Sequence, residues 1–175
     1  SDNGMPPPRA KATLYDHGVR MPLVIRWSDK SKQARIIDNP VSLIDIAPTF
    51  LDLAGIDIPA EMTGRSLKNI ILSSESGTIE NERDFVVSAI ERHVLCRENR
   101  KGYPRRALHT EDYTYVRNFE PDWWPVGDPD ILDKNGIPRY GDCDGSRTKQ
   151  FLIEKGQSGK YSDLFNLWVG KVPEE

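Results

Sequence analysis

The stretches SDNG at residues 1–4 and KATLYDHGVRMPL at residues 11–23 are the part of this sequence that decides the fold. Residues 1–22 are rich in Pro and Gly and hold most of the unusual polar side chains. The run PLVIRW at residues 22–27 follows them and ends in a polar turn. A short apolar run with such a boundary predicts a buried strand.

The polar residues of this opening suggest a site for a cation and an anion. Asp2 and Asn3 give adjacent oxygen ligands in a glycine turn, a combination that suits a hard cation such as calcium. Lys11 follows a proline-rich loop and can place a positive charge near an anionic substrate. An Asp-Asn-Gly sequence also forms ordinary turns, and surface lysines are commonly solvated. The residue types alone therefore leave both interpretations open.

Working outward, VSLIDIAPTFLDLAG at residues 41–55 predicts a helix. Asp45 is placed to act as its N-cap, and Gly55 is placed to end it in the left-handed conformation. The expected apolar face has the spacing i, i+4 and i+7 and consists of Ile46, Phe50 and Leu53. We expect this helix to be structural.

The second half of the chain has the composition of strands and loops. A polar stretch at residues 73–81 predicts an exposed loop and a subdomain boundary. A turn at residues 110–112 separates two runs with the properties of paired strands. The strands are expected at residues 85–90, 106–109, 113–119 and 151–153, an extended loop at 121–149, and a last helix at 161–169.

Composition excludes several classes of protein. The chain has 175 residues, 37% apolar and 29% charged, with a net charge of -3, which argues against a nucleic-acid partner. No apolar run approaches the roughly 20 residues that span a bilayer, so no membrane partner is expected. Cys96 and Cys143 form either one disulfide or two free thiols.

Taken together, the motifs resemble the sulfatase family. SDNG and KATLYDHGVRMPL, then VSLIDIAPTFLDLAG, then MTGRSL at residues 62–67, are similar to sulfatase signatures and occur in the family's order. ERH at 91–93, YPRRALHT at 103–110, YVRNF at 115–119 and WPVGDP at 124–129 resemble the branch that contains N-sulfoglucosamine sulfohydrolase (sulfamidase).

The resemblance implies a fold and a division of the chain. It implies an α/β, alkaline-phosphatase-like sulfatase fold, of which this chain is a C-terminal fragment with a small antiparallel sheet and a packed helix. Residues 1–72 would end the catalytic α/β domain, and residues 84–175 would form the antiparallel-sheet subdomain.

The resemblance also implies a cofactor and a modified residue. Sulfatases use calcium (Ca²⁺) and a formylglycine made from the Cys or Ser of a C/S-x-P-S-R motif, whose hydrated aldehyde attacks sulfur. Asp2 and Asn3 would be two calcium ligands, and Lys11 would be the catalytic residue that contacts a sulfate oxygen. The chain contains no such motif. We therefore expect the formylglycine upstream of Ser1, and we expect the fragment alone to be inactive.

Substrate-binding residues are expected directly after the strand at 85–90. The resemblance assigns His93 a substrate role, and Glu91 and Arg92 lie beside it. Alternation along a strand would put Glu91 and His93 on one face and Arg92 on the other. Trp123 and Trp124 either stack on a sugar ring or hold their loop against the sheet.

The resemblance implies that the parent protein hydrolyses a sulfate ester or N-sulfate on an amino-sugar polysaccharide such as a glycosaminoglycan. One alternative is a phosphodiesterase or phosphonate hydrolase of the alkaline phosphatase superfamily. Another is that the isolated fragment is a non-catalytic binding module. The expected partner is a sulfated saccharide, in a periplasmic or secreted setting in bacteria and in the lysosome in animals, with no expectation for the oligomeric state.

Overall fold

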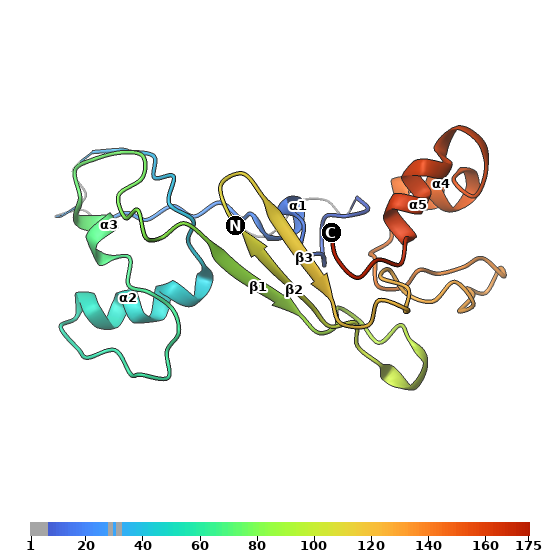
Figure 1. Ribbon diagram of the computed structural model, residues 1–175, viewed down its shortest axis with the longest axis horizontal. Coiled ribbons are helices and arrows are strands. Elements are labelled where there is room, and N and C mark those ends of the chain that lie inside the picture. The colour runs from blue at the N-terminus through green and yellow to red at the C-terminus, as the bar shows by residue number, and fades with distance from the viewer. Residues whose placement is uncertain (1–6, 28–29, 31–32) are drawn as a thin grey trace. The chain divides into compact units, whose positions relative to one another are not determined.

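The computed structural model describes residues 7–27, 30 and 33–175 of the chain (Figure 1). The chain forms two compact units. One consists of Ser1–Pro22, Ser88–Leu108 and Thr114–Glu175, and the other of Leu23–Val87 and His109–Tyr113. This division follows spatial contacts, and the expected domains 1–72 and 84–175 stay a prediction.

A three-stranded antiparallel sheet has the order β1-β2-β3. Its strands are β1 (Val86–Ile90), β2 (Arg105–His109) and β3 (Thr114–Asn118). The turn between β2 and β3 is closed by the Thr110 N–H, which donates to the Tyr113 carbonyl at 2.8 Å. The three expected strands and the hairpin are thus confirmed.

Part of the N-terminal loop packs on this sheet. Leu14 is buried with Ala107 and Val116, and Tyr15 and Val19 pack against them. The short helix α1 (Asp16–Val19) lies in this segment. Because β2 and β3 alternate their side chains, one face of the sheet is free to hold residues 14–19, and this contact fixes the loop that carries Lys11.

Helices close the same unit at the C-terminal end of the chain. They are α4 (Arg147–Lys155), the 3-10 turn η3 (Gly159–Tyr161) and α5 (Ser162–Val169), and a further turn, η2 (Glu98–Arg100), lies between β1 and β2. Their shared core contains Val126, Tyr140, Cys143, Leu152, Phe165, Trp168 and Val169. The expected strand at 151–153 is wrong, because those residues lie inside α4, which the Ser146 side chain caps by accepting from the Lys149 N–H.

The second unit is built on the 3-10 turn η1 (Leu43–Asp45), α2 (Ile46–Leu53) and α3 (Lys68–Leu72). Leu67, Ile70 and Ile71 are its buried apolar core. The predicted helix is confirmed, and Gly55 follows it with a φ of +71°. The expected apolar face is wrong in part, since Phe50 is 68% exposed.

Asp45 occupies the expected N-cap position of α2, but its side chain makes no capping hydrogen bond to that helix. Its carboxylate accepts the Ser42 N–H and the Arg65 N–H, and pairs with Arg83 at 2.9 Å. The Arg83 side chain is only 1% exposed. Asp45 therefore links the start of α2 to residues far along the chain.

The expected buried strand at residues 22–27 is wrong, whereas the expected loop at residues 73–81 is present. Residues 22–27 form neither a strand nor a helix, and Val24 is 90% exposed. The polar stretch 73–81 is held to the rest of the unit, because Gly77 pairs with Ile37 and the Asn39 side chain accepts the Ile79 N–H. In the described residues, no helix is long and apolar enough to cross a membrane.

Candidate functional site

One carboxylate connects two of the residues singled out from the sequence. Asp144 accepts from Lys11, with Nζ 2.8 Å from Oδ2, and contacts His93, with Nε2 2.9 Å from Oδ1. The three side chains are between 23% and 39% exposed, so the cluster lies at the surface and is open to a ligand. All three belong to the first unit. The structure therefore brings Lys11 and His93 together through a residue that sequence reasoning missed.

The loop that carries Lys11 is held in place on both sides. The Thr13 hydroxyl donates to the Ala10 carbonyl at 2.6 Å, and Ala12 has a φ of +64°. Arg9 donates to the Leu167 carbonyl at 3.0 Å, and its guanidinium lies 3.7 Å from the centre of the Tyr15 ring. The residues on either side of Lys11 are thus held by contacts within the loop and with α5.

Tyr15 is the second attachment of this loop. Its hydroxyl donates to the Glu175 carboxylate, and Glu175 in turn exchanges backbone hydrogen bonds of 2.9 Å with Val116 on β3. Burial, together with the hydrogen bond to Glu175, raises the pKa of Tyr15 well above its usual range. The tyrosine therefore stays a neutral donor.

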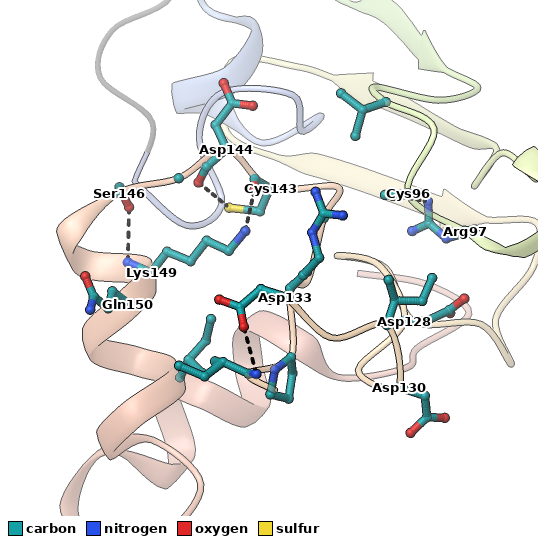
Figure 2. A pocket seen from close by; sticks show the side chains of 18 of the residues that line it. Cys96, Arg97, Asp128, Asp130, Asp133, Cys143, Asp144, Ser146, Lys149 and Gln150 are labelled. Atoms are coloured by element: carbon teal, nitrogen blue, oxygen red, sulfur yellow. Dashed lines mark hydrogen bonds between the residues drawn. The ribbon is translucent and has the colours of Figure 1, made fainter. Parts of the chain in front are cut away.

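The turn that carries Asp144 is fixed by buried cations. Lys149 donates to the Tyr140 carbonyl at 2.9 Å and to the Cys143 carbonyl at 2.6 Å, and Figure 2 shows the contact with Cys143. Arg97 pairs with Asp142 at 2.5 Å, and the two side chains are 2% and 1% exposed. Burial lowers the pKa of Lys149. Both cations hold backbone or side chains of residues 140–143, so the position of Asp144 is determined by the core beneath it.

The charges around Asp144 favour its ionised form. Hydrogen bonds from Lys11 and then from His93 lower the pKa of Asp144. An ionised carboxylate can orient both donors at once. Lys11 and His93 thus share the Asp144 carboxylate, and their roles at a sulfate-binding site stay predictions.

Asp144 also lines an open pocket of about 1220 Å³ (Figure 2). The pocket wall carries acidic and basic side chains from the loop and from α4. Labelled members of this wall in Figure 2 are Asp128, Asp130, Asp133, Ser146 and Gln150. The cluster with Lys11 and His93 therefore lies beside a large open hollow, which exceeds the range of about 300–1,000 Å³ that is typical of small-molecule sites.

Glu91 and Arg92 have other partners than His93. β1 ends at Ile90, so the alternation of a strand does not extend to them. Glu91 pairs with Arg106 at 2.5 Å, and Arg92 donates to the Arg100 carbonyl at 3.1 Å. Both line a second hollow, which does not include His93 among its lining residues. Their substrate role stays a prediction.

The expected calcium ligands Asp2 and Asn3 lie outside the described residues. Within residues 7–27, 30 and 33–175, no group of three or more His, Cys, Asp or Glu side chains is arranged to hold a metal ion. Calcium binding at Asp2 and Asn3, and the formylglycine, stay predictions.

The two cysteines are free thiols. Both line the larger pocket. Burial and the charge of Asp142 raise the pKa of Cys96 to about 11. Neither thiol therefore has the low pKa of a reactive cysteine.

No local signal in the sequence pointed to Asp144. It lies in the turn GDCDGS at residues 141–146, which has the composition of an ordinary acidic turn. Its importance depends on contacts with residues 51 positions away (His93) and further. Such pairing is a property of the fold.

Comparison with known proteins assigns the family. Residues 10–129 match the family described as N-sulphoglucosamine sulphohydrolase, C-terminal. The N-acetylglucosamine-6-O-sulfatase of Bacteroides thetaiotaomicron is 40% identical over 82% of this chain and 25% of its own length. An ulvan-active sulfatase of Formosa agariphila is 28% identical over 99% of this chain and 26% of its own length. The chain thus spans about a quarter of the length of these relatives.

A solved structure was also found, described as a complex with its substrate D-glucosamine-2-N,6-O-disulfate. It has a TM-score of 0.35 and 20% identity, and the match covers 70% of this chain and 22% of that one. The family match covers more than half of the chain, residues 10–129. This chain therefore belongs to the sulfatase family, as a C-terminal portion of the branch of N-sulphoglucosamine sulphohydrolase.

Proposed function

We propose that the whole protein hydrolyses a sulfate ester or an N-sulfate on an amino sugar of a polysaccharide, and that Lys11 and His93 contact the sulfated sugar. The observation that carries this proposal is the shared carboxylate of Asp144, which Lys11 and His93 approach within 2.8 and 2.9 Å. Lys11 and His93 are distant in sequence, but both contact Asp144, so we expect them to be preorganised for binding an anion.

Each residue of the cluster has a separate part in this proposal. The Lys11 ammonium offsets the negative charge that develops on a sulfate oxygen during cleavage of the S–O or S–N bond. His93 donates to, or accepts from, a polar group of the sugar. Asp144 is a positioning residue, because it holds both side chains and need not touch the substrate.

The remaining chemistry comes from groups that belong to the expected site. A calcium ion held in part by Asp2 and Asn3 would bind sulfate oxygens, and a formylglycine would supply the nucleophile. The names of two relatives, an N-acetylglucosamine-6-O-sulfatase and an ulvan-active sulfatase, support a sulfated sugar as the substrate class.

Release of sulfate by the whole protein tests the proposal. Substrates are glucosamine 6-sulfate, glucosamine N-sulfate and an aryl phosphate. The Lys11→Met variant is expected to lose about 10²-fold or more in kcat on the sulfated sugars, the range found for removing one donor to a developing oxyanion.

The chain offers a matched control for this variant. Lys68 pairs with Asp52 at 2.7 Å, and the two side chains are 38% and 32% exposed, almost the values of Lys11 and Asp144. Lys68→Met removes an equivalent ion pair in the other unit and should leave kcat unchanged. Equal losses in both variants, or faster release of phosphate than of sulfate, would contradict the proposal.

A further inference from the structure

A second hollow of about 500 Å³ opens at one end of the sheet. Its lining comes from three connections: Glu91 and Arg92 follow β1, Lys101, Gly102 and Pro104 precede β2, and Glu120 and Trp123 follow β3. In an antiparallel sheet of order β1-β2-β3, these three connections meet at the same end. The fold therefore gathers these residues by topology.

The backbone beneath the hollow is fixed. The Tyr103 N–H donates to the Glu91 carbonyl at 2.8 Å. A Cβ on Gly102 would lie 2.5 Å from that same carbonyl oxygen, so only glycine fits there. The connections after β1 and before β2 are thus tied closely together, and the side chains above them start from defined positions.

The hollow is lined by two cationic side chains, Arg92 and Lys101, and by two acidic ones, Glu91 and Glu120. Arg106 pairs with Glu91 at 2.5 Å and offsets its charge. The Lys101 ammonium lies 4.8 Å from the centre of the Trp123 ring. Arg92 is exposed and donates to the Arg100 carbonyl through one of its terminal nitrogens at 3.1 Å. Arg92 and Lys101 thus offer cationic donors, while Glu120 offers an acceptor.

This combination suits one class of ligand. Cationic side chains bind sulfate or carboxylate groups through charge-assisted hydrogen bonds. A carboxylate accepts from sugar hydroxyl groups, and an indole ring provides an apolar wall. A hollow of 500 Å³ lies within the range of about 300–1,000 Å³ of small-molecule sites.

We propose that Arg92, Lys101, Glu120 and Trp123 form a subsite for an anionic sugar residue that neighbours the residue being desulfated. Arg92 is directly next to His93, and consecutive Cα atoms lie about 3.8 Å apart. Under this proposal, a saccharide that contacts His93 extends into the hollow that Arg92 lines. The inference rests on the proposed function for the identity of the chain that is bound, and it makes the enzyme prefer oligosaccharides to monosaccharides.

Comparing a monosaccharide with a tetrasaccharide tests the subsite. The probes are glucosamine 6-sulfate and a size-defined heparin tetrasaccharide, and both kcat/KM and equilibrium Kd are measured in the whole protein. Lys101→Ala should lower the ratio of kcat/KM for the tetrasaccharide to that for the monosaccharide about tenfold, the effect of one charge-assisted hydrogen bond. Lys101→Glu should lower it further.

Lys171→Ala is the matched control, because Lys171 holds the neighbouring tryptophan, Trp124, at 4.3 Å in the same kind of contact but outside the hollow. It should leave the ratio unchanged. An unchanged ratio in both Lys101 variants, or an equal fall in Lys171→Ala, overturns the subsite.

Modified probes identify the anionic group and separate the two proposals. If a tetrasaccharide lacking sulfate loses the dependence on Lys101, the subsite holds a sulfate, and if a carboxyl-reduced one does, it holds a carboxylate. If Lys101→Glu weakens tetrasaccharide binding while the protein releases no sulfate, the subsite stands and the proposed hydrolysis falls. If the protein releases sulfate but the Lys101 variants bind the tetrasaccharide as tightly as the unmodified protein does, the proposed hydrolysis stands and the subsite is wrong.

Discussion

Asp144 shows how much one residue can determine at the surface of this protein. Its carboxylate lies between an ammonium and an imidazole and is only 30% exposed. Each of these contacts restricts the rotamers of a side chain, Lys11 or His93, that would otherwise move freely. In the proposed function, this carboxylate orders Lys11 and His93 before substrate binds, which reduces the entropy lost during binding.

The stability contributed by Asp144 should depend on pH. Its pKa in the folded protein is lowered by Lys11 and His93, so the ionised form stabilises the fold above the unfolded-state pKa of about 3.9. This contribution is lost as the pH falls through the folded pKa. Asp144→Asn should therefore lower the urea midpoint of the whole protein at pH 7, and the difference should shrink below about pH 4. An equal difference at pH 7 and pH 3 would contradict this assignment.

Cys96 should react slowly with alkylating reagents. Its pKa of about 11 leaves about one thiol in a thousand as thiolate at pH 8. Mass spectrometry after iodoacetamide treatment at pH 8 should show modification far slower than that of free glutathione, and the rate should rise about tenfold per pH unit up to pH 10. A rate that levels off below pH 9 would be inconsistent with the raised pKa.

At the residue scale, the sequence predicted Lys11 and His93 but not their anchor. Motif spacing identifies residues that a family places in a site. The contacts of Asp144 arise only when the turn at 140–146 is fixed by Lys149 and Arg97, which are themselves buried by tertiary packing. A local pattern contains no information about such a contact.

At the scale of elements, periodicity gave the right structure where an element is stabilised by its own pattern. The side chains of β2 and β3 alternate on either side of a short turn, and α2 is followed by Gly55, which adopts a φ of +71°. Periodicity gave the wrong element where tertiary packing and helix capping determine the structure. Residues 151–153 are apolar like a strand, but the Ser146 cap and the burial of Leu152 make them part of α4.

The link between α2 and the later part of its unit depends on a buried ion pair. Arg83 contacts Asp45 at 2.9 Å and Glu80 at 2.8 Å. Arg83→Met leaves Asp45, only 6% exposed in its side chain, without its partner. Breaking a buried pair in this way should lower the free energy of unfolding by about 3–5 kcal/mol, as measured by urea denaturation of the whole protein.

A surface pair provides the comparison for Arg83. Arg20 and Asp16 are 3.8 Å apart, and their side chains are 82% and 62% exposed. Arg20→Met should change the free energy of unfolding by less than about 1 kcal/mol. If the two variants lose equal stability, burial is not the reason for the effect of Arg83.

At the scale of the whole molecule, the chain belongs to the sulfatases, and its small antiparallel sheet with packed helices agrees with what was expected of a C-terminal portion, while the alkaline-phosphatase-like fold of the whole protein stays a prediction. The expected strand at 22–27 is the informative exception. Its apolar pattern predicts burial, yet Val24 is 90% exposed. An apolar run indicates that its side chains are buried in the folded protein. The described residues do not cover the side chain of Val24.

Exposed apolar side chains predict how this chain behaves when it is produced alone. In the unit of Leu23–Val87 and His109–Tyr113, Ile36 is 77% exposed, Leu43 71% and Phe50 68%. Large exposed apolar surface binds partners or promotes association. The isolated 175-residue chain should therefore enhance ANS fluorescence several-fold more per mole than the whole protein, and Phe50→Asp should reduce this excess. A single sharp melting transition of the isolated chain without dye binding would show that these side chains need no covering partner.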